Sequence, residues 1–189
     1  MINIEIFQKY FVCKKDTSYK LYFGKSLLYF AQKNIDIIDF YELGCMMISV
    51  SYKDIERFYT RKRKHDRLLD SKKVLQEKVY INDNNDFYTN YEKIKNVKDK
   101  ETTSYIYSLV EYVPYRFLSY GQWNKILKGL FDYQKNELIE QLSKESYYND
   151  IYFINKKKII FNKKFLNDVE MNFEKYLNFI NNEIEKYFS

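Results

Sequence analysis

The stretch LNDVEMNFEKYLNFINNEIEKY, residues 166–187, carries the clearest hydrophobic period in this chain. Its apolar residues recur at intervals of three and four, which places them along one side of an α-helix. These residues are Leu166, Val169, Phe173, Tyr176, Leu177, Ile180, Ile184 and Tyr187. The pattern predicts a C-terminal helix whose apolar seam packs inside the domain. It leaves open a second use of the seam, as the interface of a homodimer.

A second helical pattern covers residues 52–81. Acidic residues lie near its start, where the helix dipole favours them, and the pattern predicts one long helix. Ile55, Leu68 and Leu75 can share its apolar face, and His65 falls on the same stripe. A histidine on an apolar face is more often a packing residue than a catalyst.

Helical spacing also appears on either side of the middle of the chain. Residues 35–50 are largely apolar and predict a buried helix, in which Gly44 allows a neighbouring element to approach closely. A further helix is expected to end near Pro114, which cannot continue one without a kink. Ser119 then marks the expected start of a core helix that reaches Leu142.

Strand patterns are fewer. Two apolar runs, residues 151–154 and 159–161, flank a lysine-rich turn and predict a β-hairpin. At the N-terminus the letters INIEIF alternate as in a strand, although the neighbouring residues also suit a helix. The fold predicted from these segments is mainly α: an irregular helical domain with a small β-hairpin near residues 151–161. Whether the N-terminus adds a short strand is left open.

Length and composition predict how the chain is organised. A chain of 189 residues buries enough surface for one hydrophobic core, so residues 1–189 are expected to form a single domain. Four glycines and one proline are few, which favours long elements over a turn-rich sandwich or barrel. Residues 82–104 form the most polar segment, predicted as a surface connection between two helical parts.

Several classes of protein are not supported by the residues present. The N-terminus has no basic leader and no apolar run approaches about 18 residues, so a cytoplasmic protein without a membrane partner is expected. Two separated cysteines, Cys13 and Cys45, and one histidine cannot complete an ordinary zinc set. Phosphate-binding glycine loops are absent. We therefore expect neither a metal nor a cofactor.

Positive charge is concentrated in residues 57–73, which we call the basic segment. The chain carries a net charge of +6, from 32 basic and 26 acidic residues. The bases of the segment are Arg57, Arg61, Lys62, Arg63, Lys64, Arg67, Lys72 and Lys73. Only Asp66 and Asp70 oppose them there, so the segment alone carries +6 and the rest of the chain is neutral.

This charge distribution predicts nucleic-acid binding. Closely spaced bases on one helix repel each other unless they are solvated or neutralised, and phosphates are common neutralisers. We expect a non-enzymatic protein that binds RNA, DNA or a nucleoprotein complex through the eight bases of the basic segment. A phage or mobile-element inhibitor of host defence, such as an anti-CRISPR, is one example of that class. Lysines at 156–158, 163 and 164 form a second cluster, which could extend the positively charged surface of the basic segment.

Two alternatives stay open. An arginine and a histidine on one helix are similar to the motif of the HEPN ribonucleases, all-helical toxin or abortive-infection proteins in which four to six residues separate the two. That likeness implies a metal-independent ribonuclease that uses His65 with Arg61 or Arg57. Here three residues separate Arg61 from His65 and seven separate Arg57 from it, so neither spacing matches. The other alternative is a structural partner-binding protein that uses the C-terminal seam.

Overall fold

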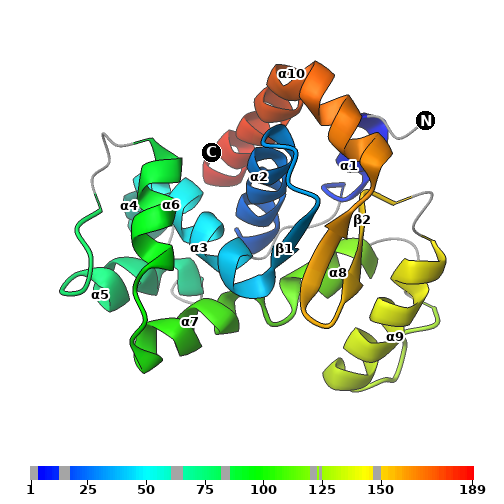
Figure 1. The fold of residues 1–189 in the computed structure, drawn as a ribbon, viewed down its shortest axis with the longest axis horizontal. Coiled ribbons are helices and arrows are strands. Elements are labelled where there is room, and N and C mark those ends of the chain that lie inside the picture. Colours follow the sequence, from blue (N-terminus) through cyan, green and yellow to red (C-terminus); the bar gives the residue numbers. More distant parts are fainter. Residues whose placement is uncertain are drawn as a thin grey trace.

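A computed structural model describes residues 4–12, 18–60, 66–81, 86–119, 123, 125–146 and 150–189. These residues form a mostly helical protein with a small three-stranded antiparallel sheet (Figure 1). The mainly α prediction is therefore confirmed. None of the helices within the described ranges is long and apolar enough to cross a membrane.

Ten α-helices and two short 3-10 helices follow one another among the described residues. The α-helices are α1 (Ile4–Lys9), α2 (Tyr19–Gln32), α3 (Phe40–Ser51), α4 (Ile55–Thr60), α5 (Ser71–Leu75), α6 (Phe87–Lys95), α7 (Lys100–Val110), α8 (Val113–Ser119), α9 (Asp132–Glu145) and α10 (Lys163–Phe188). The 3-10 helices are η1 (Tyr52–Asp54) and η2 (Arg67–Asp70). In Figure 1, α10 crosses the top of the molecule, and α9 lies at the opposite lower end.

Helix α10 packs across α2. The predicted seam of α10 is buried at Leu166, Val169, Tyr176, Ile180, Ile184 and Tyr187, and half-buried at Phe173 and Leu177. The helix kinks at Asn172, where the backbone leaves helical angles. The prediction that the seam packs inside the domain is confirmed. Because the chain covers its own seam, the structure does not support a homodimer through it.

The sheet confirms the predicted hairpin and adds a strand. Strands β2 (Tyr152–Asn155) and β3 (Lys158–Phe161) are antiparallel neighbours, and β1 (Ile37–Asp39) pairs with the other edge of β3. Ile38 lies opposite Ile159 in this pairing, and both are buried. The suggested N-terminal strand is wrong, because residues 4–9 form α1. Phe7, on the buried side of α1, packs against α10 aromatic rings, and this contact favours the helix.

Helix α3 is buried on nearly every side, as its apolar sequence predicts, but it begins only at Phe40 and not at residue 35, because residues 37–39 pair with β3. It begins with a capping box: Asp39 accepts from the Glu42 backbone N–H, and the Glu42 side chain accepts from the Asp39 backbone. Gly44 lies against Ile106 of α7, so the predicted close approach is confirmed. A Cβ atom at residue 44 would lie 2.6 Å from Ile106 Cγ2 and 2.9 Å from the Ile106 carbonyl oxygen.

The single helix predicted over residues 52–81 is wrong. The described residues there form η1, α4, η2 and α5 instead. Asp66 has extended backbone angles (φ −81°, ψ 109°), and its side chain caps η2 by accepting from the Leu68 N–H. An aspartate that bonds nearby backbone groups offers the chain an alternative to continuous helix. The apolar residues Ile55, Leu68 and Leu75 nevertheless all reach the core.

Two other predicted segments also differ in the structure. Residues 82–104 contain α6, whose Tyr91 and Ile94 are buried against α3, so this polar segment contributes to the core. The helix expected from Ser119 to Leu142 is wrong. Ser119 ends α8, and α9 begins only at Asp132, after Gly129 adopts φ +84°. That left-handed conformation favours glycine and interrupts a right-handed helix.

Candidate nucleic-acid interface

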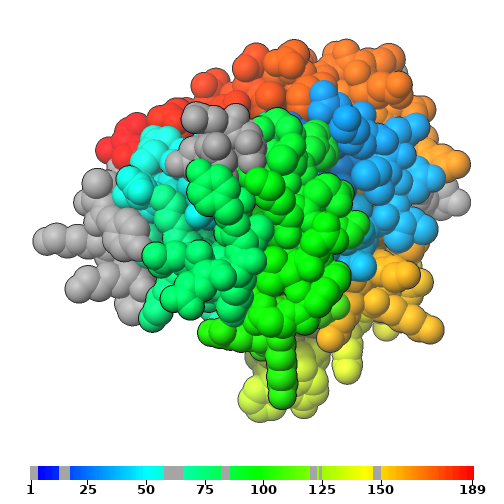
Figure 2. Space-filling view, turned by 60° about the vertical axis from the view of Figure 1, so that its left-hand side comes forward, coloured from blue at the N-terminus to red at the C-terminus, as the bar shows by residue number. Residues whose placement is uncertain are grey.

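The structure describes four of the eight bases predicted to bind nucleic acid: Arg57, Arg67, Lys72 and Lys73. The contiguous bases Arg61, Lys62, Arg63 and Lys64 lie outside the described residues, as does His65. Their roles in binding or catalysis therefore stay predictions. The C-terminal part of the basic segment lies at the surface beside α6 and α7 (Figure 2).

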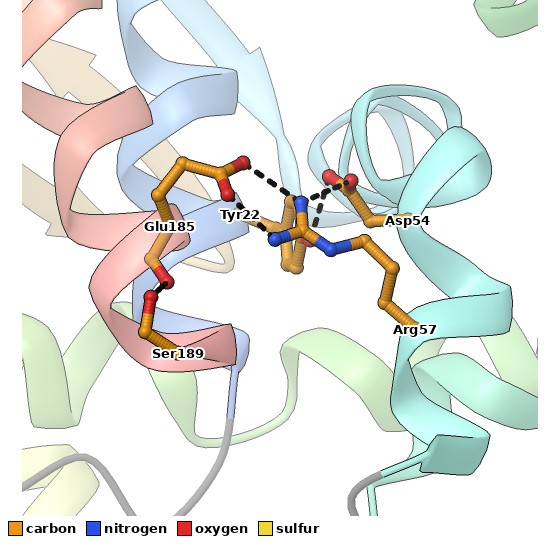
Figure 3. Close-up of polar contacts among 5 residues, drawn as sticks. All are labelled: Tyr22, Asp54, Arg57, Glu185 and Ser189. Carbon is orange, nitrogen blue, oxygen red and sulfur yellow. Dashed lines mark hydrogen bonds and ion pairs between the residues drawn. The ribbon is translucent and has the colours of Figure 1, made fainter.

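Arg57 anchors the N-terminal end of the basic segment to the body of the protein (Figure 3). Its guanidinium donates to both carboxylate oxygens of Glu185 on α10, at 2.8 and 2.7 Å, and to Asp54 Oδ1 at 3.1 Å. The guanidinium also lies over the Phe188 ring, 4.3 Å from its centroid. Tyr22 on α2 donates to the second Asp54 oxygen at 2.9 Å. Arg57 is therefore already engaged by carboxylates of the protein itself.

The basic segment has a second anchor at Asp66. This side chain is 3% exposed, and its Oδ2 accepts from the Ser18 N–H at 2.8 Å and the Ser18 hydroxyl at 2.6 Å. The next backbone N–H, that of Arg67, donates to the Tyr19 hydroxyl at 2.7 Å, and Tyr105 donates to the Arg67 carbonyl. The chain is therefore held on both sides of residues 61–65: Arg57 is bound to α10, and Asp66 is bound to Ser18.

The remaining described bases of the segment differ in their surroundings. Lys72 donates to Glu56 at 2.9 Å and lies over the Tyr52 ring. Arg67 and Lys73 are exposed, and neither has an ion-pair partner among the residues that the structure describes. The expectation that one helix presents all eight bases together is wrong, because the segment is broken and because Arg57 and Lys72 pair with internal carboxylates.

The Arg57–Glu185 pair predicts a pH-dependent contribution to stability. The Arg57 guanidinium holds the pKa of Glu185 below its ordinary value of 4.5. The pair therefore contributes fully above that ordinary pKa, and the contribution is lost as pH falls through the lowered folded pKa. We expect Glu185→Gln to reduce stability at neutral pH by a small amount, since Glu185 is 64% exposed.

Urea denaturation at a series of pH values checks this prediction. The difference between Glu185→Gln and the unmodified protein should shrink in acid, because both then carry an uncharged side chain. Glu170→Gln on the exposed side of α10 is the matched control and should change stability at no pH. A difference that persists unchanged below the pKa of the carboxyl contradicts the assignment.

The second lysine cluster does not continue the basic segment. Lys156 and Lys157 form the β2–β3 turn with φ values of 49° and 61°, whereas Lys163 and Lys164 begin α10 beyond the other end of β3. All four side chains are exposed. Figure 1 shows the hairpin well separated from α4 and α5, so the second cluster lies apart from the described bases of the basic segment.

The described residues show little that points to metal or thiol chemistry. They contain no group of three or more histidine, cysteine, aspartate or glutamate side chains that could hold a metal ion. Cys45 is buried on α3, and burial raises the pKa of its thiol to about 12. A thiol held in its protonated form is a poor nucleophile.

One site was missed by the sequence analysis. A cavity of about 400 Å³ adjoins the Arg57 contacts, and Lys25 and Tyr29 of α2 line it together with residues of η1, α6 and α10. The available signal was Lys25 itself, a lone charge within the apolar run LYFGKSLLYF. Its significance depends on which elements surround α2, and the sequence pattern does not reveal them.

Comparison with known proteins adds no relative to this description. No family model matches the chain, and no curated protein or solved structure is significantly similar to it.

Proposed function

We propose that this protein binds nucleic acid, alone or within a nucleoprotein complex, through the basic segment and without catalysing a reaction. The observation that supports this most directly is the state of three of the four carboxylates closest in sequence to Arg61, Lys62, Arg63 and Lys64; the fourth, Asp70, is exposed. Asp54 pairs with Arg57, Glu56 pairs with Lys72, and Asp66 is turned into the core. These three acids are therefore engaged by other described residues, and we propose that the four consecutive bases contact an external anion.

The anchors on either side of residues 61–65 also support the proposal. Arg57 binds Glu185 of α10, and Asp66 binds Ser18 before α2, so the chain is held to the body on both sides of residues 61–65. Binding to a stretch held at both sides costs less conformational entropy than binding to a free tail. Arg67 and Lys73, which follow residues 61–65 in the chain, are exposed and add further positive charge.

The proposed chemistry is contact with phosphate groups. Arginine and lysine neutralise phosphates without changing their own protonation, so no titrating group such as His65 is needed. Each phosphate contact should contribute about 0.7 to 0.9 to the slope of log affinity against log salt. Inhibition of a host nucleoprotein machine, as by an anti-CRISPR, is a biological role that this binding would serve.

Charge reversal at Arg61→Glu, Arg63→Glu and Lys64→Glu together tests the proposal. We expect the triple variant to bind fluorescently labelled single-stranded RNA and duplex DNA at least tenfold more weakly at low salt, and with a shallower salt dependence. Fluorescence anisotropy at several salt concentrations measures both quantities.

The matched control reverses Lys125, Lys128 and Lys175, which are exposed and have no ion-pair partner among the described residues. It makes the same change in net charge elsewhere on the surface, and its affinity should stay close to that of the unmodified protein. Equal losses in both variants would show that overall charge drives binding. Full binding by the Arg61, Arg63 and Lys64 variant, or no binding of either nucleic acid by the unmodified protein, contradicts the proposal.

A further inference from the structure

The cavity beside Arg57 is lined by five elements, and α3 and η1 are the only two of them that follow one another directly in the chain. Lys25 and Tyr29 come from α2, Ser49 and Val50 from α3, and further lining residues come from η1, α6 and α10. Its volume of about 400 Å³ lies within the range of pockets that hold small organic molecules. Val50 and Ile184 are buried apolar residues of its lining.

Three polar side chains of the lining have no hydrogen-bond or ion-pair partner among the described residues. They are the Lys25 ammonium, the Tyr29 hydroxyl and the Asn181 amide. Lys25 and Tyr29 lie one helical turn apart on α2, so they face the same side of it. Tyr29 as a whole is only 5% exposed, so it is a largely buried part of the lining. The lining therefore offers hydrogen-bond donors that a ligand could use.

The carboxylates of the lining are already occupied. Glu185 accepts from Arg57 through both oxygens, while Asp54 accepts from Arg57 and from Tyr22 (Figure 3). A cationic ligand would have to displace these bonds and would also be repelled by Lys25 and Lys53. The charge that remains available in the cavity is positive.

We propose that this cavity binds a small organic anion, whose carboxylate or phosphate group is held by Lys25 and whose apolar body packs against Val50 and Ile184. Tyr29 and Asn181 supply further donors to the same group. The proposal is independent of nucleic-acid binding, because Lys25 and the cavity lie outside the basic segment.

The charges around Lys25 set the pH dependence of this site. Burial lowers the pKa of Lys25, and Lys53 of η1 lowers it further, whereas Asp54 of η1 and Glu185 of α10 raise it. The α6 residues of the lining, Phe87 and Asn90, carry no charge. An anion binds the protonated amine, so its affinity should fall as pH rises through the lowered pKa of Lys25.

Four probes that share one ring test the proposal: benzoate, phenyl phosphate, benzyl alcohol and benzylammonium. Binding is measured from chemical-shift changes of backbone amides on titration. We expect one or both anions to bind in the millimolar range or tighter, with shifts at α2 and at the end of α10. The neutral and cationic probes should bind at least tenfold more weakly. The tighter of the two anions identifies the preferred head group.

Variants at Lys25 assign the binding to this side chain. Lys25→Met keeps the apolar stem and should weaken anion binding about tenfold or more, whereas Lys9→Met on the exposed face of α1 should not change it. Lys25→Arg should retain binding and remove its loss at high pH, because arginine stays charged. This variant keeps the test decisive even if Lys25→Met fails to fold. The proposal is overturned if neither anion binds, if benzyl alcohol binds as well as benzoate, or if Lys25→Met binds like the unmodified protein.

Discussion

Replacing Phe117 by alanine is expected to lower the free energy of unfolding by about 3–5 kcal/mol. The Phe117 side chain is fully buried, and its ring lies 4.8 Å from that of Tyr10, 4.8 Å from that of Phe23 and 5.4 Å from that of Phe11. It also stacks with Tyr152 of β2. The substitution therefore removes contacts that join α8 to the N-terminal residues, α2 and the sheet, and it leaves a cavity between them.

Chemical denaturation of Phe117→Ala and Phe131→Ala measures the effect against a matched control. Phe131 is 70% exposed, so its replacement should change stability by no more than about 0.5 kcal/mol. The pair also tests whether the buried aromatic residues of this chain stabilise its core. Many of the Tyr and Phe side chains that the structure describes are buried, which indicates that they contribute much of the core. A loss at Phe117 as small as that at Phe131 would contradict this conclusion.

Gly44→Ala is expected to lower the free energy of unfolding by about 2 kcal/mol, although alanine favours helices. The new Cβ would lie 2.6 Å from Ile106 Cγ2 and 2.9 Å from the Ile106 carbonyl oxygen. Helix α3 and helix α7 must then move apart, and overpacking of this kind costs about 1–3 kcal/mol. The helix propensity gained offsets only about 1 kcal/mol of the total strain.

A double-mutant cycle with Ile106→Ala checks the cause of this loss. Removing Ile106 Cγ2 relieves one of the two close contacts, so the double variant should lose less stability than the two single variants summed. The contact with the backbone oxygen remains, and the relief should be partial. Additive losses, or a Gly44→Ala protein as stable as the unmodified one, would contradict the close-packing explanation.

The elements that could be predicted from the sequence are those with a strong local period. The spacing of the apolar residues in α10 predicts the stripe that is buried in the structure. The two apolar runs on either side of the lysine turn form β2 and β3. In each case the residues that decide the conformation lie within a few positions of one another. Gly44 was also predicted to allow a close neighbour, but only the structure shows that Ile106 is that neighbour.

The elements that could not be predicted depend on contacts between distant residues. Strand β1 exists because residues 37–39 pair with β3, whose partner Ile159 is far along the chain. The predicted helix over residues 52–81 is interrupted at Asp66, which is extended and binds Ser18. A hydrophobic period indicates which residues are buried. It does not indicate which polar side chain will interrupt a helix because it bonds a backbone group far away in the sequence.

By itself, the sequence determined that this protein is mainly helical, that it contains a hairpin near residue 156 and that its excess positive charge lies in residues 57–73. The tertiary structure decided which of the described charges are paired. It pairs Arg57 with Glu185 across 128 positions and turns Asp66 into the core. It also places Lys25 in a cavity formed by distant segments. The physical reason is that periodicity and charge density are local properties of a chain, whereas the partner of a charged side chain depends on which segments fold against it.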